Sequence, residues 1–357
     1  MEKLVSFVIP CYNAEKFIGE CLESIVRQTI GIDSIEVIVV DDASTDGSLS
    51  ILAEYEKKYP DSISIIAQQE NGGQAVARNI GMDMVTAPYM ALLDVDDWVA
   101  DTFCEKMLEP AERYRPDFIG CGITEIYADE NCIKTVENSG QFVELKDVET
   151  RKQFMREYTI LSVTEGCLYR TEFIRSKNIR FKSYPKYEDN YWGMLILFNM
   201  ESYYGVSEAL LYYRVLENSN SRSRNDTRHF CRLQVELDKI AYLMEKGIFR
   251  DYYKEIRNTF LQTFYGNTLH IIFSQFDEIP MDVIRAMQSA VRELFPDYLE
   301  YYKEQGEFIN PAITVAFDFP IEVWEEFKKN YLQYLRTDNG EKLITFFTSM
   351  RKNVFQE

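Results

Sequence analysis

The feature that most constrains the fold of this chain is the regular alternation of strand patterns and helix patterns over its first 93 residues. Short runs rich in β-branched and aromatic residues predict strands at 5–10, 35–40, 63–67 and 89–93. Apolar residues at helical spacing predict helices between these strands, at 14–29, 49–59 and 74–84. Strands and helices that alternate in this way form a parallel sheet covered on both faces, with ligands at the carboxyl ends of the strands.

The remainder of the chain predicts a second domain of a different kind. A single hydrophobic core usually stops growing at about 250 to 300 residues, so 357 residues are expected to form two domains. Further strands are expected at 118–127 and 166–169, and further helices at 146–156 and 191–200. After the polar run 217–227, the composition changes to aromatic-rich helical segments at 230–246, 250–276 and 281–294. We therefore expect an α/β domain at 1–224 and a mainly helical domain at 225–357.

Tyrosines at helical spacing are the most prominent residues of the C-terminal domain. They include Tyr252, Tyr253, Tyr265, Tyr298, Tyr301, Tyr302, Tyr331 and Tyr334. A hydrophobic core explains some of them, but each buried hydroxyl needs a hydrogen-bond partner, so others are expected to face a ligand or a partner. We interpret this domain as one for ligand binding, homo-oligomerisation or both.

Charge and composition exclude several classes of protein. The formal net charge is −19, from 58 acidic and 39 basic side chains, so the overall field repels nucleic acid and other polyanions. The seven cysteines are scattered without a C-x-x-C pair and are expected to be reduced packing residues. No apolar run reaches the length of a transmembrane helix, and the N-terminus lacks a secretory pattern. The expected location is the cytoplasm, with peripheral association at the inner face of the membrane as an option.

Acidic residues follow the fourth predicted strand directly. Asp94 and Asp96 alternate by two at the end of the run 89–93. Mg²⁺ and Mn²⁺ prefer hard oxygen ligands, and they usually take one or two protein carboxylates while substrate phosphates and water fill the other positions. The pattern therefore predicts a Mn²⁺ or Mg²⁺ site at this strand end.

Four blocks of the sequence resemble the inverting glycosyltransferases of family 2, which have the GT-A fold and build bacterial surface polysaccharides. The blocks are VSFVIPCYNAEKFIGECLESIVRQT, IEVIVVDDASTDGS, QENGGQAVARNIGM and YMALLDVDDWV, in the expected order. A single D-x-D occurs by chance in any acidic protein, whereas four ordered blocks are specific. The resemblance covers roughly the first 220 residues. It implies a Rossmann-like nucleotide-diphospho-sugar transferase domain with a mixed, mainly parallel sheet.

The resemblance also assigns roles to individual residues. It implies that Tyr12 stacks on the nucleobase and that Pro10 shapes the base pocket through its backbone. Asp42 would read the base edge, and Asn71 and Arg78 would hold base, ribose or diphosphate. Asp94 would lie near ribose and metal, and Asp96 would bind the metal directly. Asp97 is expected to be structural.

Two downstream segments complete the expected site. The stretch Tyr187 to Trp192 is similar to the acidic pair that supplies the family's catalytic base, which implies that Asp189 deprotonates the acceptor and that Glu188 orients it or contacts the acceptor. The segment 211–221 looks like the family's closing stretch, often a mobile lid over the diphosphate. Arg222 could offset phosphate charge and His229 could be a third metal ligand; a plain surface position is the alternative for His229.

The predicted activity is a metal-dependent inverting transfer from a UDP-sugar to a glycan, lipid-linked or protein-linked acceptor. A sugar-nucleotide nucleotidyltransferase is the first alternative, but it would need a glycine-rich loop with a basic residue after the first strand, and 11–14 has none. The second alternative is a nucleotide-binding scaffold that has lost catalysis. Donor sugar, acceptor and linkage are not fixed by the fold.

Overall fold

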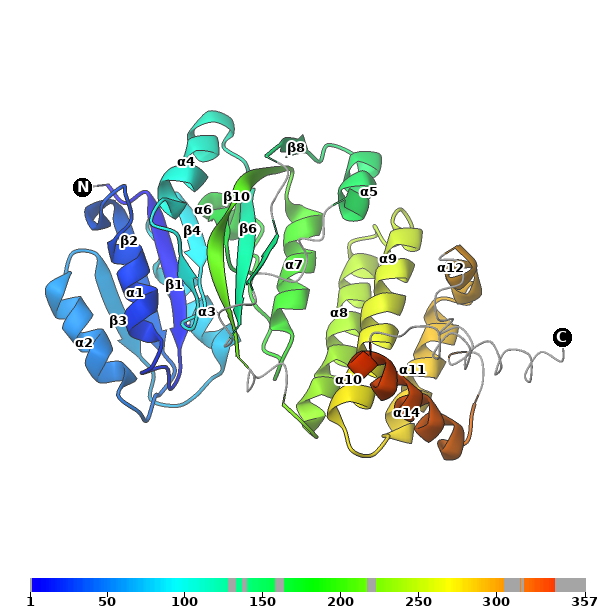
Figure 1. The fold of residues 1–357 in the computed structure, drawn as a ribbon. Helices are drawn as coiled ribbons and strands as arrows, with labels where there is room; N and C mark the ends of the chain where they lie inside the picture. Colours follow the sequence, from blue (N-terminus) through cyan, green and yellow to red (C-terminus); the bar gives the residue numbers. More distant parts are fainter. Residues whose placement is uncertain are drawn as a thin grey trace. The chain divides into compact units, whose positions relative to one another are not determined.

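A computed structural model describes residues 2–127, 133–136, 140–157, 164–216, 223–304, 315 and 318–337 of the chain. The chain divides into two compact units, Met1–Glu217 and Asn218–Glu357 (Figure 1). This division falls in the polar run 217–227, earlier than the boundary expected at 225. Each unit is described below by itself.

The first unit is built on one mixed sheet. Its described strands are β1 (Val5–Cys11), β2 (Ile35–Asp41), β3 (Ile63–Ala67), β4 (Tyr89–Leu92), β5 (Trp98–Val99), β6 (Phe118–Tyr127), β7 (Ile133–Val136), β8 (Phe142–Glu144), β9 (Cys167–Arg170) and β10 (Ser202–Val215). The strand order is β3-β2-β1-β4-β9-β6-β10-β5, with β7 on β6 and β8 on β10. Strands β3, β2, β1 and β4 are mutually parallel, and β9 is antiparallel to both of its neighbours. The expected mixed α/β sheet is confirmed.

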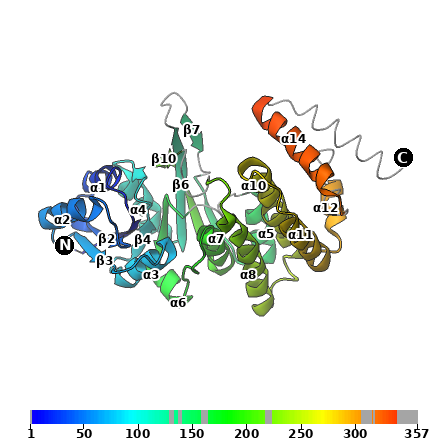
Figure 2. The same ribbon diagram turned by 90° about the horizontal axis from the view of Figure 1, so that it is seen from below.

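Helices cover both faces of this sheet. They are α1 (Ile18–Val26), α2 (Ser48–Lys58), α3 (Gln74–Met84), α4 (Phe103–Tyr114), α5 (Val148–Glu157), α6 (Thr171–Ser176) and α7 (Glu188–Asn199), with a short 3-10 helix η1 (Ile32–Ser34). Helices α1, α2 and α4 share a core with β1 and β2, and Figure 2 shows α3 and α6 on the opposite face. Burial of apolar side chains on both faces explains why β1 and β2 are apolar almost throughout.

Glycine at position 81 allows α3 to lie directly on the sheet. A Cβ atom built there would come within 2.5 Å of Val8 Cγ1 in β1. A larger residue would force the helix outward, because close-packed cores tolerate little added volume. Since α3 also carries Arg78, this contact sets how far the arginine reaches over the sheet edge.

The second unit is mainly helical, as expected. Its described helices are η4 (Thr227–Phe230), α8 (Cys231–Glu245), α9 (Tyr253–Phe260), the π-helical turn η5 (Leu261–Asn267), α10 (Thr268–Gln275), α11 (Met281–Leu294), α12 (Tyr298–Glu304) and α14 (Ile321–Thr337). The expected single helix at 250–276 is therefore divided by a π-helical turn. Tyr252, Tyr265 and Tyr298 are buried, so these three belong to the core of the unit.

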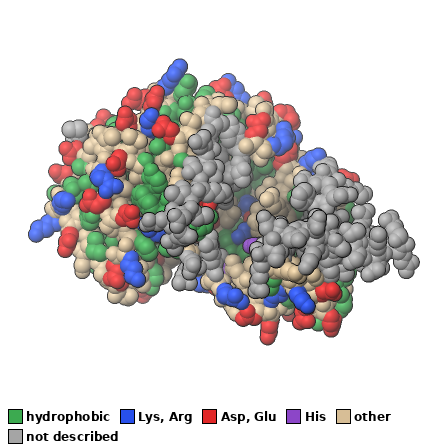
Figure 3. Space-filling view, in the orientation of Figure 1, with side chains coloured by type: hydrophobic (Ala, Val, Ile, Leu, Met, Phe, Trp, Pro, Cys, Tyr) green, Lys and Arg blue, Asp and Glu red, His purple; other side chains and the backbone are tan. Residues whose placement is uncertain are grey.

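Surface character and cysteine state agree with an ordinary globular protein. On the face of the first unit drawn in Figure 3, acidic and basic side chains are interspersed. Six described cysteines are free, and five of them are buried, which fits the expected packing role; Cys132 lies outside the described residues. In the described part of the chain, none of the helices combines the length and the apolar character needed to cross a bilayer.

Candidate active site

The carboxyl ends of the parallel strands carry the first group of predicted site residues. Strands β1 and β2 are in register from Val5 with Ile35 to Cys11 with Asp41, so Tyr12 and Asp42 follow at the same edge of the sheet. Pro10 is buried in β1, whereas the side chain of Tyr12 is 50% exposed. An aromatic ring half open to solvent at a strand end offers a surface for stacking, and stacking of Tyr12 on a nucleobase stays a prediction.

Asp42 holds a loop in addition to any role toward a ligand. It is buried, and its carboxylate accepts hydrogen bonds from the backbone N–H groups of Gly72 (2.8 Å) and Gly73 (2.7 Å) and from Gln68 Nε2 (2.8 Å). Asn71 Nδ2 donates to the Asp42 carbonyl oxygen (3.1 Å). These bonds fix the loop before α3. Reading of a base edge by Asp42 stays a prediction, and its acceptor atoms already have three donors.

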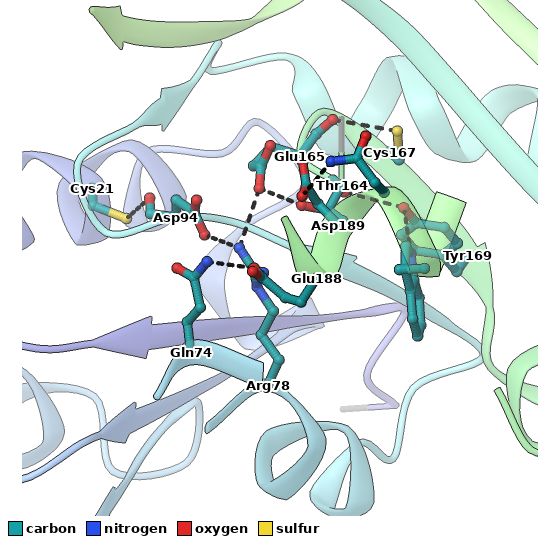
Figure 4. A network of polar contacts seen from close by, with 12 residues as sticks. Cys21, Gln74, Arg78, Asp94, Thr164, Glu165, Cys167, Tyr169, Glu188 and Asp189 are labelled. Carbon is teal, nitrogen blue, oxygen red and sulfur yellow. Dashed lines mark hydrogen bonds and ion pairs between the residues drawn. The ribbon is translucent and has the colours of Figure 1, made fainter. Parts of the chain in front are cut away.

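Arg78 is the centre of the site. It extends from α3 toward three carboxylates that come from distant parts of the chain (Figure 4). Its Nη2 donates to Asp94 Oδ1 (2.6 Å) and lies 3.4 Å from Glu165 Oε1, and its Nη1 donates to Glu188 Oε1 (2.7 Å). Only 2% of the arginine side chain is exposed. The guanidinium therefore joins the end of β4, the residues before β9 and the start of α7.

The electrostatics of this Arg78 cluster favour its charged form. Burial opposes the charge on Arg78, but Asp94, Glu188 and Glu165 more than offset that effect and raise its pKa. Burial, with the charge of Asp94, raises the pKa of Glu165 to about 8, although Arg78 acts in the opposite direction. Because three carboxyl groups surround one cation, the cluster has more acidic than basic groups, which is an arrangement suited to a further cation.

The turn after β4 presents the D-x-D residues. The backbone N–H of Asp97 donates to the Asp94 carbonyl oxygen (3.1 Å) and closes the turn. Burial, together with the charge of Asp94, raises the pKa of Asp96 to about 6. Among the described residues, Asp96 forms no ion pair with a basic side chain. Asp97 is buried and accepts from the backbone N–H of Arg214 (2.8 Å), which supports the structural role expected for it.

Arg214 supports this turn from the neighbouring strand β10. Its Nε donates to the Asp96 carbonyl oxygen (3.0 Å), its guanidinium pairs with Glu20, and it lies 4.6 Å from the ring centre of Trp98. Residues 211–214 were expected to belong to a mobile closing stretch. That expectation is wrong for them, because they pair with β5 and β6 inside the sheet.

The start of α7 supplies the predicted base. Tyr187 precedes the helix with a left-handed backbone (φ 65°), and Glu188 and Asp189 form the first turn. Glu188 is buried and also accepts a short hydrogen bond from Gln74 Nε2. Asp189 is partly exposed, and its Oδ1 accepts from Asn190 Nδ2 (3.2 Å). Figure 4 shows both acids beside Arg78 and Glu165.

Aromatic packing fixes α7 against the sheet. Trp192 Nε1 donates to Tyr169 Oη (3.2 Å), and the Trp192 ring stacks on Phe181 with centres 4.2 Å apart. The Phe181 ring in turn lies 5.1 Å from the Arg78 guanidinium. Rigid packing of this kind holds catalytic groups in a fixed geometry.

Two predicted site residues do not belong to the described part of the first unit. Arg222 lies outside the described residues. His229 belongs to the second unit, where it is buried beside Phe276, with Nε2 3.0 Å from the Ser223 carbonyl oxygen. The alternative that His229 is a surface residue is wrong. Its role as a metal ligand stays a prediction.

Three residues of the site were missed by the sequence analysis: Gln74, Glu165 and Arg214. Gln74 lies one helical turn before Arg78, so i,i+4 spacing on α3 could have indicated it. Glu165 precedes strand β9, and only the antiparallel pairing of β9 with β4 brings it to the strand end that Asp94 follows. Arg214 has no local signal, because only the pairing of β10 brings it to the turn.

The carboxylates present fit a Mn²⁺ or Mg²⁺ ion. Among the described residues no three His, Cys, Asp or Glu side chains could hold a metal ion by themselves. Mg²⁺ sites in phosphate-transferring enzymes usually need only one or two protein carboxylates, because substrate phosphates and water complete the shell. Asp96, with its raised pKa and without a basic partner among the described residues, together with Asp94, meets that requirement.

Comparison with known proteins gives one consistent family. The model of glycosyl transferase family 2 matches residues 6–176. The uncharacterized glycosyltransferase EpsJ of Bacillus subtilis is 31% identical over 223 residues, 62% of this chain and 63% of that protein. The putative teichuronic acid biosynthesis glycosyltransferase TuaG of Bacillus subtilis is 31% identical over 228 residues, 62% of this chain and 82% of that protein. The chain thus spans less than two thirds of the length of EpsJ.

A solved structure confirms the fold. The S. aureus protein TarS, residues 1–349, in complex with UDP-GlcNAc superimposes with a TM-score of 0.56, over 85% of this chain and 92% of that chain. The sequences are 18% identical. This likeness supports the GT-A fold of the first unit followed by a helical region.

Proposed function

The chain belongs to glycosyltransferase family 2, and from this premise we propose that it transfers a sugar from a UDP-sugar to an acceptor hydroxyl. The proposed reaction is metal-dependent and inverts the anomeric centre. The acceptor is a glycan, a lipid-linked or a protein-linked molecule in bacterial surface polysaccharide or glycoconjugate synthesis. Family membership also removes the reason to retain the nucleotidyltransferase alternative.

The main support for the proposal is the Arg78 cluster, which consists of Arg78 and its partners Asp94, Glu165 and Glu188. Its ion pairs hold the D-x-D turn and the start of α7 at one edge of the sheet, through Asp94 on one side and Glu188 on the other. Asp96 lies two residues after Asp94, and Asp189 directly follows Glu188. Single-step transfer requires a site for the leaving diphosphate and a base for the acceptor hydroxyl, close to each other. The buried side chain of Arg78 positions the segments that would supply both.

Asp96 and Asp94 are the residues that would hold Mn²⁺ or Mg²⁺. A bound divalent ion neutralises the charge that develops on the diphosphate as it leaves. Tyr12 would stack on the base, and Pro10 and Asn71 would border it. Both terminal nitrogens of Arg78 donate to carboxylates, so we assign this residue to positioning Asp94 and Glu188; direct contact with the diphosphate was the alternative.

Asp189 would accept the proton of the acceptor hydroxyl while that oxygen attacks the anomeric carbon opposite the diphosphate. The new C–O bond forms as the bond to the UDP oxygen breaks, so no covalent nucleophile on the protein is required. Asp189 is partly exposed whereas Glu188 is buried, and a base that meets an incoming acceptor must be accessible. This difference favours Asp189 as base and Glu188 as a positioning residue.

Relatives indicate a class of donor and pathway, although not the individual molecules. TarS was solved with UDP-GlcNAc, and TuaG is named for teichuronic acid synthesis. We propose a UDP-sugar donor by analogy, used at the cytoplasmic side where such donors are available. Acceptor binding and self-association through the helical unit belong to the same proposal.

A donor screen tests the proposal. Full-length protein is incubated with individual UDP-sugars and Mn²⁺, and release of UDP is measured. We expect release with at least one donor, loss of release on chelation, and loss in Asp96→Ala. Asp101→Asn is a matched control, because Asp101 is an exposed acid near the same turn; it should retain the wild-type rate. Saturable UDP binding without turnover by any donor would favour the scaffold alternative instead.

A further inference from the structure

A second pocket lies at the opposite end of β4 from the candidate active site. Asp94 follows the carboxyl end of this strand, whereas Tyr89 begins it. Asp94 comes five positions after Tyr89, which corresponds to about 16 Å of extended chain at roughly 3.3 Å per residue. The pocket has a volume of about 380 Å³, and its lining includes Tyr89, Arg115, Arg170 and Arg175. All of these residues belong to the first unit.

Two buried donors in this pocket lack acceptors. Tyr89 is 7% exposed, and its hydroxyl has no hydrogen-bond partner among the described residues. The Nε atom of Arg170 is likewise buried without a partner there. Buried polar groups in proteins are almost always hydrogen-bonded, so two unmet donors at one pocket indicate that it takes an acceptor. Burial raises the pKa of Tyr89, so its hydroxyl keeps the proton that it would donate.

Three arginines and one acid, Glu172, line the pocket, and this excess of positive charge favours an anion as the acceptor. Arg170 is paired with Asp117 and Glu172, and Arg175 donates to the Val85 carbonyl oxygen (2.6 Å). Arg115 forms no ion pair with any described residue. The positive charges of Arg170 and Arg115 both act on the Tyr89 hydroxyl. A concentration of three arginines is unexpected in a chain with a net charge of −19, and guanidinium groups match phosphate oxygens in geometry.

We propose that this pocket binds a ligand that carries a phosphate group. Tyr89, Arg115 and Arg170 line the pocket from separate elements: β4, the end of α4 and the end of β9. The volume is in the range of small-molecule sites, so the phosphate would be part of a larger molecule. The site is separate from the predicted donor site and adds a second ligand to the protein.

Calorimetric titration of the full chain tests this proposal. Glycerol 3-phosphate and inorganic phosphate are the soluble probes, and vesicles containing phosphatidylglycerol, compared with phosphatidylcholine alone, test a lipid headgroup as the source. We expect saturable binding of at least one phosphate probe. Tyr89→Phe and Arg115→Gln should each weaken that binding at least about tenfold, because each removes a hydrogen bond to a charged group. Binding of vesicles alone would identify the source as a headgroup.

Control variants keep the result interpretable. Arg113→Gln removes the same charge from the same end of α4, but Arg113 does not line the pocket, so this variant should bind like the wild type. Tyr89→Phe should unfold at the wild-type temperature, since its hydroxyl has no partner to lose. Absence of saturable binding to every probe would overturn the proposal, and so would unchanged affinity in both pocket variants, which would leave water as the occupant.

Discussion

Removal of the Arg78 guanidinium should destabilise the folded protein, because this group links three carboxylates of the candidate site. In Arg78→Met, the buried Glu188 and Glu165 lose their basic partner, and Asp94 loses a 2.6 Å ion pair. Breaking a buried ion pair by removing one partner typically costs about 3 to 5 kcal/mol. Because Asp94 is 31% exposed and can regain water, we expect the lower end, a loss of about 3 kcal/mol in the free energy of unfolding at pH 7.

The pH dependence of this loss has a definite sign. Glu165 has a pKa of about 8 in the folded protein and 4.5 as its ordinary value, so it binds its proton more tightly when folded. Its contribution to stability is present at low pH and is lost as pH rises through 8. Arg78 lowers that pKa, so in Arg78→Met the proton is retained to higher pH. The deficit of the variant relative to wild type should therefore increase between pH 7 and pH 9.

Urea unfolding followed by tryptophan fluorescence measures this effect. Trp192 is a local reporter because it stacks on Phe181, which lies over Arg78. Arg27→Met is the matched control: Arg27 forms an exposed 3.4 Å ion pair with Asp101, and such pairs contribute about 0 to 1 kcal/mol. A loss below about 1 kcal/mol for Arg78→Met at pH 7 would refute the view that the cluster holds the site together.

Three further predictions follow from other parts of the site. Gly81→Ala should lower the free energy of unfolding by about 1 to 3 kcal/mol in urea denaturation, because its Cβ would meet Val8; Gly19→Ala in α1, where a Cβ meets nothing, should be neutral or stabilising. Arg214→Met should raise the Mn²⁺ concentration for half-maximal UDP release while the far-ultraviolet circular dichroism stays unchanged; an unchanged Mn²⁺ dependence would exclude a supporting role for Arg214. Chelation should abolish UDP release and added Mn²⁺ should restore it, whereas release in chelator would contradict metal dependence.

Local sequence patterns were sufficient to predict the first four strands and the helices between them. Strand β3 and helix α3 begin and end at the predicted residues, because an isoleucine-rich run marks the strand and the turn Asn71-Gly72-Gly73 marks the start of the helix. The same reasoning failed for β10, which the sequence analysis did not predict as a strand. The segment 202–215 carries charged and polar residues that become acceptable only because β5, β6 and β8 pair with it.

Only those candidate site residues that lie in recognisable sequence motifs were predicted. Asp94 and Asp96 were predicted from their place after a strand, and Asp189 was predicted from the resemblance of its segment to the family's acidic pair. Glu165 could be found only once β9 was known to pair with β4, since no motif surrounds it. His229 illustrates the reverse case: a polar neighbourhood in the sequence suggested exposure, but packing beside Phe276 buries it.

The most direct test of the central claim separates donor binding from turnover in one variant. Asp189→Asn keeps the size of the side chain and removes its basic oxygen. Loss of a general base costs about 10² to 10⁴ in rate, so we predict a fall of this size in sugar transfer to the acceptor. The affinity for UDP and Mn²⁺, measured by calorimetry on the same preparation, should remain unchanged. Transfer at the wild-type rate in Asp189→Asn would contradict the assigned mechanism.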